Sequence, residues 1–260
     1  MAGHSKWANI QHRKGRQDKA RSKLFSKLSK DITIAAKLGS PDVDMNPRLR
    51  LAVNNAKGQS MPKDNIQRAI SKGSAGEGAD YDEMRYEGFG PAGIGIIVEV
   101  STDNKNRAAM EVRTAFSKNG GALGETGTVS FGFDQIGEIT YPLGAGDEDA
   151  VMEAAMEAGA DDVQSDETSH EPDNGPDNAP LHTFLTARDQ LAVVAAELEK
   201  ALGDAPKSVN LIWKAQNMID APDKAVTVMN LVEALEDLDD VQTVYHNLEL
   251  SDAALAALEA

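Results

Sequence analysis

The chain of 260 residues contains no cysteine, which excludes disulfides, a thiolate nucleophile and cysteine-ligated metals. Aromatic residues make up only 5% of it, and no apolar run approaches the roughly 18 residues that a membrane-spanning helix needs. The N-terminal end also lacks the apolar stretch of a secretory signal, and Asp18 and Asp31 interrupt the acid-poor composition of a transit peptide. We therefore expect a cytoplasmic protein with no membrane partner.

Residue patterns for metal, cofactor or catalytic chemistry are also scarce. The segment GFGPAG (88–93) matches G-x-G-x-x-G, but it precedes a predicted strand, and Pro91 opposes the helix that should hold a pyrophosphate. Ser60 and Lys63 fit S-x-x-K without its partner motifs. The five histidines lack the i, i+4 spacing of a helical metal site. We predict no metal, no cofactor and no catalytic residues, hence not an enzyme.

Acidic residues are scarce at the N-terminal end. Residues 1–76 hold 16 Lys and Arg against 5 Asp and Glu (net +11), whereas the other 184 residues hold 10 against 37 (net −27). The segment 73–83, GSAGEGADYDE, is typical of a linker. The formal net charge of −16 therefore combines a basic module that can meet a polyanion with acidic units that repel nucleic acid.

The basic segment needs only charge, reach and an open surface to bind nucleic acid. Lysine and arginine neutralise phosphates and release counterions, and the rings of Trp7 and His12 suit contact with a base or ribose. The competing interpretation is a solvated helix face that binds nothing. Because the basic residues continue over two further helices beside units of opposite charge, we favour nucleic-acid binding. The predicted contact residues are Lys6, Trp7, His12, Arg13, Lys14, Arg16, Lys19, Arg21, Lys23, Lys27, Lys63 and Arg68.

The hydrophobic pattern predicts a small helical bundle in residues 1–78. Apolar residues recur at three- and four-residue spacing in three stretches, which predicts helices over 18–38, 47–57 and 62–72. Asn46 followed by Pro47 supplies a capping residue and a proline at the first helical position. Short connections between amphipathic helices are typical of a bundle.

The remainder of the chain predicts α+β structure. Strands are expected at 94–100, 128–133, 208–214 and 241–248, with helices at 107–119 and 223–238. Their order, βαββαβ, is that of a ferredoxin-like unit. A second series lies between them, with strands at 137–142, 161–167 and 181–187 and helices at 147–158 and 189–202.

An inserted domain is the simplest account of these two series, because short connections do not otherwise pair the outer strands. We expect three domains in an α+β chain. These are a basic helical bundle (1–78), a ferredoxin-like unit (79–133 and 205–250) and an acidic ferredoxin-like unit inserted into it (134–204). The acidic units are candidates for protein contacts.

Several long motifs resemble one known family. They are GHSKWANIQHRKGRQD, MPKDNIQRAISKG, YEGFGPAGIGIIVE, TDNKNRAAMEVR and NGGALGETGTVSF, in this order. Together they closely resemble the YebC family, which includes the mitochondrial translational activator of cytochrome c oxidase, almost from end to end. The resemblance implies a helical N-terminal domain followed by two α+β domains, one of which interrupts the other.

The resemblance also implies two alternative functions. The family has long been labelled as probable transcriptional regulators that bind DNA, whereas its mitochondrial member implies a ribosome-associated factor that assists translation, particularly through consecutive prolines. A flexible basic segment with one Trp and one His suits irregular RNA, so we favour ribosomal RNA or tRNA as the partner. DNA-binding transcription control is the second interpretation, with Asn65, Gln67 and Arg68 on a recognition helix. A protein-interaction module without nucleic acid is the third.

Overall fold

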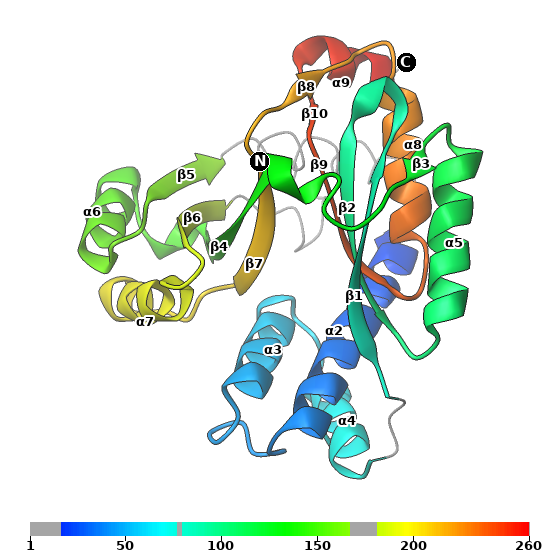
Figure 1. The fold of residues 1–260 in the computed structure, drawn as a ribbon. Coiled ribbons are helices and arrows are strands. Elements are labelled where there is room, and N and C mark those ends of the chain that lie inside the picture. Colours follow the sequence, from blue (N-terminus) through cyan, green and yellow to red (C-terminus); the bar gives the residue numbers. More distant parts are fainter. Residues whose placement is uncertain (1–16, 77–79, 167–180, 260) are drawn as a thin grey trace.

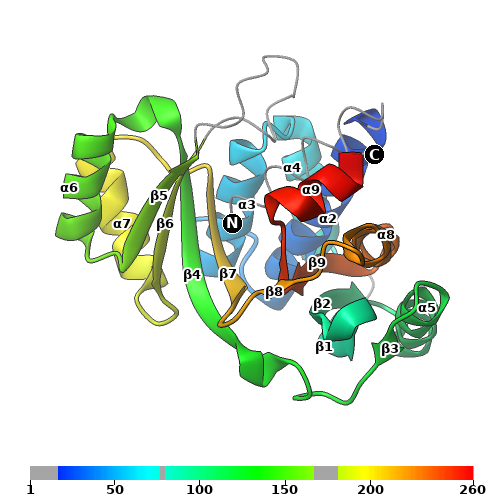
Figure 2. The ribbon, with the colours of Figure 1, turned by 90° about the horizontal axis from the view of Figure 1, so that it is seen from above.

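The computed structural model describes residues 17–76, 80–166 and 181–259. It has three parts, which are a helical bundle, an outer α+β unit and a second α+β unit whose chain interrupts the outer one (Figures 1 and 2). The predicted α+β class with an N-terminal helical region is therefore confirmed. Within these described ranges, no helix is both long and apolar enough to cross a membrane.

The bundle consists of α2 (Gln17–Leu38), α3 (Pro47–Gly58) and α4 (Lys63–Ser74). Asn46 caps α3, because its side chain accepts a hydrogen bond from the backbone N–H of Leu49 and donates to Ala35 O at 2.8 Å. Gly73 lets α4 approach α2 closely, since a Cβ at this position would lie 2.4 Å from Thr33 O. The close approach of α4 to α2 shapes the groove described below.

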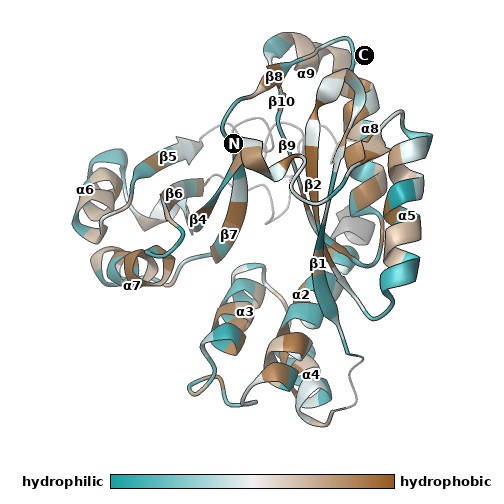
Figure 3. Ribbon diagram, viewed as in Figure 1, coloured by the Kyte–Doolittle hydropathy of each residue, from teal (hydrophilic) through white to brown (hydrophobic). Residues whose placement is uncertain are grey.

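The outer unit is an antiparallel sheet in the order β3-β1-β2-β9. Its strands are β1 (Asp82–Phe89), β2 (Gly95–Thr102), β3 (Ala122–Leu123) and β9 (Val241–His246). Two helices, α5 (Lys105–Lys118) and α8 (Ala225–Glu236), cover one face of the sheet (Figures 1 and 2). The buried residues Ile96, Val98 and Val100 of β2 share a core with these helices, and β2 and α8 are accordingly apolar in Figure 3.

The C-terminal end adds short elements to the outer unit. They are the parallel pair β8 (Ile219–Asp220) and β10 (Leu248–Glu249) and the helix α9 (Asp252–Glu259). The described parts of the α+β units also contain short 3-10 helices, at Pro91–Gly93 (η1), Ser130–Gly132 (η2) and Leu143–Ala145 (η3). The helix α9 packs on α8 through Ala254 and Leu258, which extend the core of the outer unit.

The second α+β unit has the antiparallel strand order β5-β6-β4-β7. Its elements follow one another as β4 (Phe133–Pro142), α6 (Glu148–Ala158), β5 (Asp162–Asp166), β6 (Leu181–Ala187), α7 (Leu191–Leu202) and β7 (Ser208–Ala215). This βαββαβ order with the fourth strand beside the first is the ferredoxin-like arrangement. Both helices lie on one face of the sheet (Figure 2), where Ile139, Tyr141 and Phe184 form the core with them.

Two of the predicted strands were assigned wrongly. The stretch expected as a strand at 128–133 is mostly a turn, because the backbone N–H groups of Val129 and Ser130 each donate to Glu87 Oε2 at 2.8 Å. The strand expected at 208–214 does not belong to the first sheet, since β7 pairs with β4 and places Ile212 opposite Ile136. The other two strands of the outer sheet are instead β1 and β3, neither of which was predicted from the sequence.

These pairings change where an inserted domain would begin and end. A unit that keeps β4 and β7 together spans residues 133–215, instead of the predicted 134–204. The outer unit then retains β1, β2 and β3 from before the insertion and α8 and β9 from after it. We propose this division as the domain organisation of the chain.

The bundle contacts the second unit through the edge of its sheet. Asn55 of α3 behaves like a neighbouring strand, because its side chain accepts from Val209 N at 3.0 Å and donates to Val209 O at 3.2 Å. Gly58 lies even closer, since a Cβ there would be 1.9 Å from Lys207 O. The helix α3 therefore covers the outer edge of β7.

A tryptophan lies where the two α+β units meet. Trp213 of β7 and Tyr245 of β9 both pack against a cluster that includes Ile97 of β2, and the Trp213 indole N–H donates to Glu99 Oε1 at 3.0 Å. The Arg85 guanidinium lies over the indole ring, 4.7 Å from its centroid. The Trp213 side chain therefore joins the two α+β units through both polar and apolar contacts.

Candidate nucleic-acid interface

Six of the twelve predicted contact residues lie outside the described residues, which begin at 17. They are Lys6, Trp7, His12, Arg13, Lys14 and Arg16. Lys19 is part of α2, but its side chain also lies outside the description. The structure therefore places the other five, which are Arg21, Lys23, Lys27, Lys63 and Arg68.

Lys23 and Lys27 are partly buried on α2, and both ammonium groups bind acceptors of the outer unit, so their contact with nucleic acid stays a prediction. The Lys23 ammonium donates to the backbone O of Asp237 at 3.0 Å and forms an ion pair with its carboxylate. The Lys27 ammonium donates to Gln242 O at 3.0 Å, and burial lowers the pKa of Lys27 although Glu236 opposes this effect. Lys23 thus holds α2 against the end of α8 and Lys27 holds it against β9, because charged donors there satisfy backbone carbonyls.

Lys63 and Arg68 are both exposed on α4, but they point to different sides. Five residues of α-helix separate their side chains by about 140° around the axis. Arg68 lines a groove between α2 and α4, where its guanidinium donates to the side chain of Asn65. Lys63 lies outside this groove. Arg21 is exposed near the N-terminal end of α2, with its guanidinium 5.4 Å from the centroid of the Phe25 ring.

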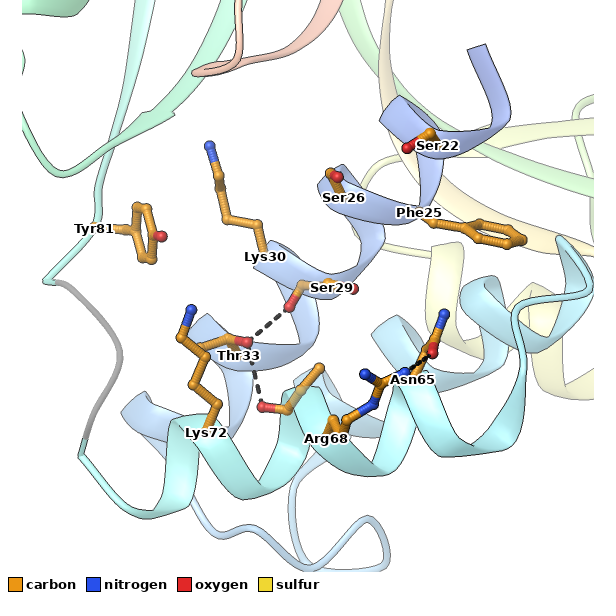
Figure 4. Close-up of a pocket in the computed structure, with 11 residues that line it drawn as sticks. Ser22, Phe25, Ser26, Ser29, Lys30, Thr33, Asn65, Arg68, Lys72 and Tyr81 are labelled. Atoms are coloured by element: carbon orange, nitrogen blue, oxygen red, sulfur yellow. Dashed lines mark hydrogen bonds between the residues drawn. The ribbon is translucent and has the colours of Figure 1, made fainter. Parts of the chain in front are cut away.

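The groove between α2 and α4 is a cavity of about 530 Å³ (Figure 4). Its lining residues come mainly from one face of each helix, because residues three and four apart share a helix face. They are Ser22, Phe25, Ser26, Ser29, Lys30, Thr33, Asn65, Arg68, Ala69, Lys72 and Tyr81. The floor is fixed by Thr33, whose hydroxyl contacts Ser29 O at 2.8 Å and Ala69 O at 3.2 Å (Figure 4).

The eleven lining residues include three cations and no carboxylate, in a chain that holds 42 Asp and Glu. One of these cations, Lys30, is already engaged, because its ammonium donates to Ser101 O and Asp239 O at 3.0 Å each. Within the described ranges, Arg68 and Lys72 form no ion pair. The groove therefore offers two positive charges beside neutral hydroxyl groups, which suits an anionic ligand.

Of the residues that line the groove, Arg68 was predicted as a contact and Asn65 as part of a recognition helix, but most of the others were not predicted. Lys30, Lys72 and Tyr81 were not among the predicted contact residues, and neither were the three serines. The available signal was the helical spacing of Ser22, Ser26 and Ser29 along α2. That spacing could not identify α4 as the opposite wall.

Two buried titratable side chains elsewhere in the described chain, His182 and Asp240, have structural partners. No cluster of three or more His, Asp or Glu residues suited to a metal occurs among the residues that the structure describes. His182 is buried, with Nδ1 at 2.7 Å from Ser165 Oγ and Nε2 at 3.0 Å from Gly146 O. Asp240 is buried too, and it binds Arg107, Thr102 and Lys30. Burial opposes its ionisation, but hydrogen bonds from Arg107 and Thr102 outweigh this effect and lower the pKa of Asp240.

Comparison with known proteins agrees with this architecture of a helical domain before two α+β units. The sequence profile of the TACO1/YebC protein N-terminal domain matches residues 5–76. The profile of the TACO1/YebC second and third domain matches residues 81–248. The chain therefore belongs to the TACO1/YebC family, as the motifs predicted.

The relatives have regulatory names. A probable transcriptional regulatory protein of Maricaulis maris is 65% identical over 260 residues, which is the full length of both chains. Another from Hyphomonas neptunium is 57% identical over 261 residues and covers 99% of each chain. The crystal structure of a conserved hypothetical protein of Aquifex aeolicus superposes with a TM-score of 0.76 at 41% identity, covering 88% of this chain and 90% of that one.

Proposed function

We propose that the protein is a non-enzymatic, nucleic-acid-binding regulator of gene expression that contacts the phosphate backbone with its helical bundle. The observation that carries this proposal is the groove between α2 and α4, whose described lining residues include Arg68 and Lys72 and no carboxylate. The surrounding bundle is basic as well, since Arg50, Lys57 and Lys63 are exposed. Cations free of acidic neighbours neutralise phosphates at the lowest cost. The acidic α+β units limit indiscriminate binding and are free to contact proteins.

The names of the relatives support duplex DNA as the target, and hence control of transcription. Phosphate contacts from the bundle would position the protein on a duplex, and base contacts would have to specify the sequence. Of the three residues predicted for a recognition helix, Arg68 and Asn65 bond to each other beside the groove, whereas Gln67 is exposed. A duplex-reading α4 would therefore have to rearrange this pair.

A second candidate, a cytoplasmic translation factor that binds ribosomal RNA or tRNA, is favoured by the shape of the groove. A cavity of about 530 Å³ with the rings of Phe25 and Tyr81 among its lining residues suits unpaired bases more than a regular duplex. Such a factor would assist stretches that are difficult to translate, including consecutive prolines, as the family resemblance implies.

Crosslinking in cells, followed by sequencing of the attached nucleic acid, separates these candidates. Recovery of promoter DNA would support transcription control, and recovery of ribosomal RNA or tRNA would support the translation factor. Co-sedimentation with ribosomes at physiological salt, lost when Arg13, Lys14 and Arg16 become Glu, would strengthen the second. Recovery of no nucleic acid above background would overturn the proposed function and leave a protein-interaction module.

A further inference from the structure

We propose that the groove between α2 and α4 binds a single-stranded segment of nucleic acid, with its phosphates on Arg68 and Lys72 and a base against Tyr81. This proposal rests on the proposed function and specifies its ligand as a single strand. It concerns chemistry that RNA and single-stranded DNA share, namely phosphodiesters joined to unstacked bases.

The size of the groove limits how many nucleotides it can hold. The stretch of α2 from Ser22 to Thr33 is about 16 Å long at 1.5 Å per residue, and the cavity volume is about 530 Å³. This volume is in the range of pockets that hold one small molecule, roughly 300–1,000 Å³. An intact duplex, whose major groove alone is about 12 Å wide, can touch only the rim. A strand of one or two nucleotides fits the groove itself.

Charge along one wall of the groove suits consecutive phosphates. Arg68 and Lys72 are four residues apart on α4, so their Cβ atoms lie about 5–6 Å from each other. Figure 4 shows that Lys72 extends its ammonium towards Tyr81, whereas Arg68 lies beside Asn65. The hydroxyl groups of Ser22 and Ser26 are exposed on the α2 wall, where they can donate to phosphate oxygens.

The aromatic ring of Tyr81 lies at the end of the groove where Lys72 is found (Figure 4). Tyr81 lies just beyond the linker, where its side chain is partly exposed, and the Lys30 ammonium is 5.3 Å from the centroid of its ring. Lys30 is held in turn by Ser101 O and Asp239 O. The ring is therefore positioned by the outer unit before any ligand arrives, and a base that stacks on it contributes about 1–3 kcal/mol.

The test compares two double variants of the full-length protein that remove the same charge. Arg68→Gln with Lys72→Gln changes the groove, and Arg113→Gln with Lys118→Gln changes two exposed cations of α5, which lie outside the bundle and the groove. Fluorescence anisotropy measures binding of labelled oligo(dT) and oligo(rU) ten-mers and of a labelled duplex. We expect the groove variant to weaken single-strand binding at least tenfold and the control variant to weaken it less than threefold.

The salt dependence and Tyr81 provide independent readouts. The groove variant should reduce the slope of log K against log salt for the single strand by about 1.4, because two phosphate contacts are lost. Tyr81→Leu should weaken binding severalfold, and Tyr81→Phe should leave it unchanged because the ring remains. Circular dichroism melting checks that each variant is folded.

Equal losses in the two double variants, or none in the groove variant, would overturn the inference. Binding of the duplex alone would also overturn it, while the proposed function would stand. Binding of neither form by the wild-type protein would overturn both. Tighter binding of oligo(rU) or of oligo(dT) would identify the natural strand.

Discussion

The carboxylate of Glu87 is buried in the outer unit and is bound by backbone donors. It is 1% exposed and accepts hydrogen bonds from Val129 N, Ser130 N and the Arg85 side chain. Burial opposes its ionisation, but the hydrogen bonds from the Ser130 and Val129 backbone outweigh burial and lower the pKa of Glu87 to about 2. One side chain thus holds the glycine-rich loop before β4 against β1.

Replacing Glu87 with Gln should lower the free energy of unfolding by about 2–3 kcal/mol at pH 7. The folded pKa lies below the unfolded value of roughly 4.3, so the contribution is complete above that pH and disappears as the pH falls towards 2. Urea unfolding of wild type and variant should therefore differ at pH 7 and converge at about pH 2 to 3.

The exposed Glu125 in the same loop provides the control for this prediction. Glu125→Gln should change the free energy of unfolding by less than about 0.5 kcal/mol at either pH. Equal effects of the two substitutions at pH 7 would show that Glu87 contributes only as a surface charge.

Asp240 connects three elements at one carboxylate. It receives the Arg107 guanidinium of α5 at 2.6 Å and the Thr102 hydroxyl of β2 at 2.8 Å, and Lys30 of α2 lies 3.6 Å away. Asp240→Ala should lower the free energy of unfolding by about 2 kcal/mol, because buried donors lose their acceptor. Asp239→Ala, at the exposed neighbouring position, should change it by less than about 0.5 kcal/mol in the same urea titration.

At the scale of elements, the contact between α3 and β7 depends on one amide. Asn55→Ala removes both hydrogen bonds to Val209 and should lower stability by about 1–3 kcal/mol, since the N–H and C=O of the strand lose their partner. Hydrogen exchange of the Val209 amide should accelerate in this variant. Asn54→Ala, on the neighbouring side of the helix, should leave the exchange of that amide unchanged.

The elements that the sequence predicted well are those with a regular apolar period and a clear end. The helices α2, α3 and α4 were predicted to within two residues, because their buried stripes and Asn46–Pro47 are visible in the sequence. The strand β1 was missed because DEMRYEGF is half-exposed and mostly polar. The turn at 128–132 was missed because its geometry depends on Glu87, which lies 42 residues away from Val129.

The sheet to which each strand belongs and the residues of the groove were less predictable, because both depend on contacts between residues that are distant in the sequence. Nothing local distinguishes a β7 that pairs with β4 from one that pairs in the outer sheet, since both arrangements bury Val209 and Ile212. The charge of Lys23 and Lys27 was visible, but the acceptors that bind them lie more than 200 residues away along the chain. Arg68 was predicted from charge, whereas only the tertiary structure identifies Lys72 and Tyr81 as residues that line the same groove.

At the scale of the whole molecule, the basic bundle and the acidic remainder predict a strong dependence of nucleic-acid binding on salt. If about six phosphates are engaged, log K should fall against log salt with a slope of about −4 for a single strand and about −5 for a duplex. Anisotropy titrations between 50 and 300 mM KCl, values on the order of physiological ionic strength, measure this slope. A slope near zero would contradict binding through phosphates.

Trp213, at the junction of the α+β units, provides an intrinsic fluorescence probe of the contact between them. The chain has two tryptophans, so Trp7→Phe leaves a single indole, which donates to Glu99 and stacks under Arg85. Separation of the two units would bring water to this ring and shift its emission to longer wavelength. Stopped-flow fluorescence can therefore time any opening of the molecule without an attached dye.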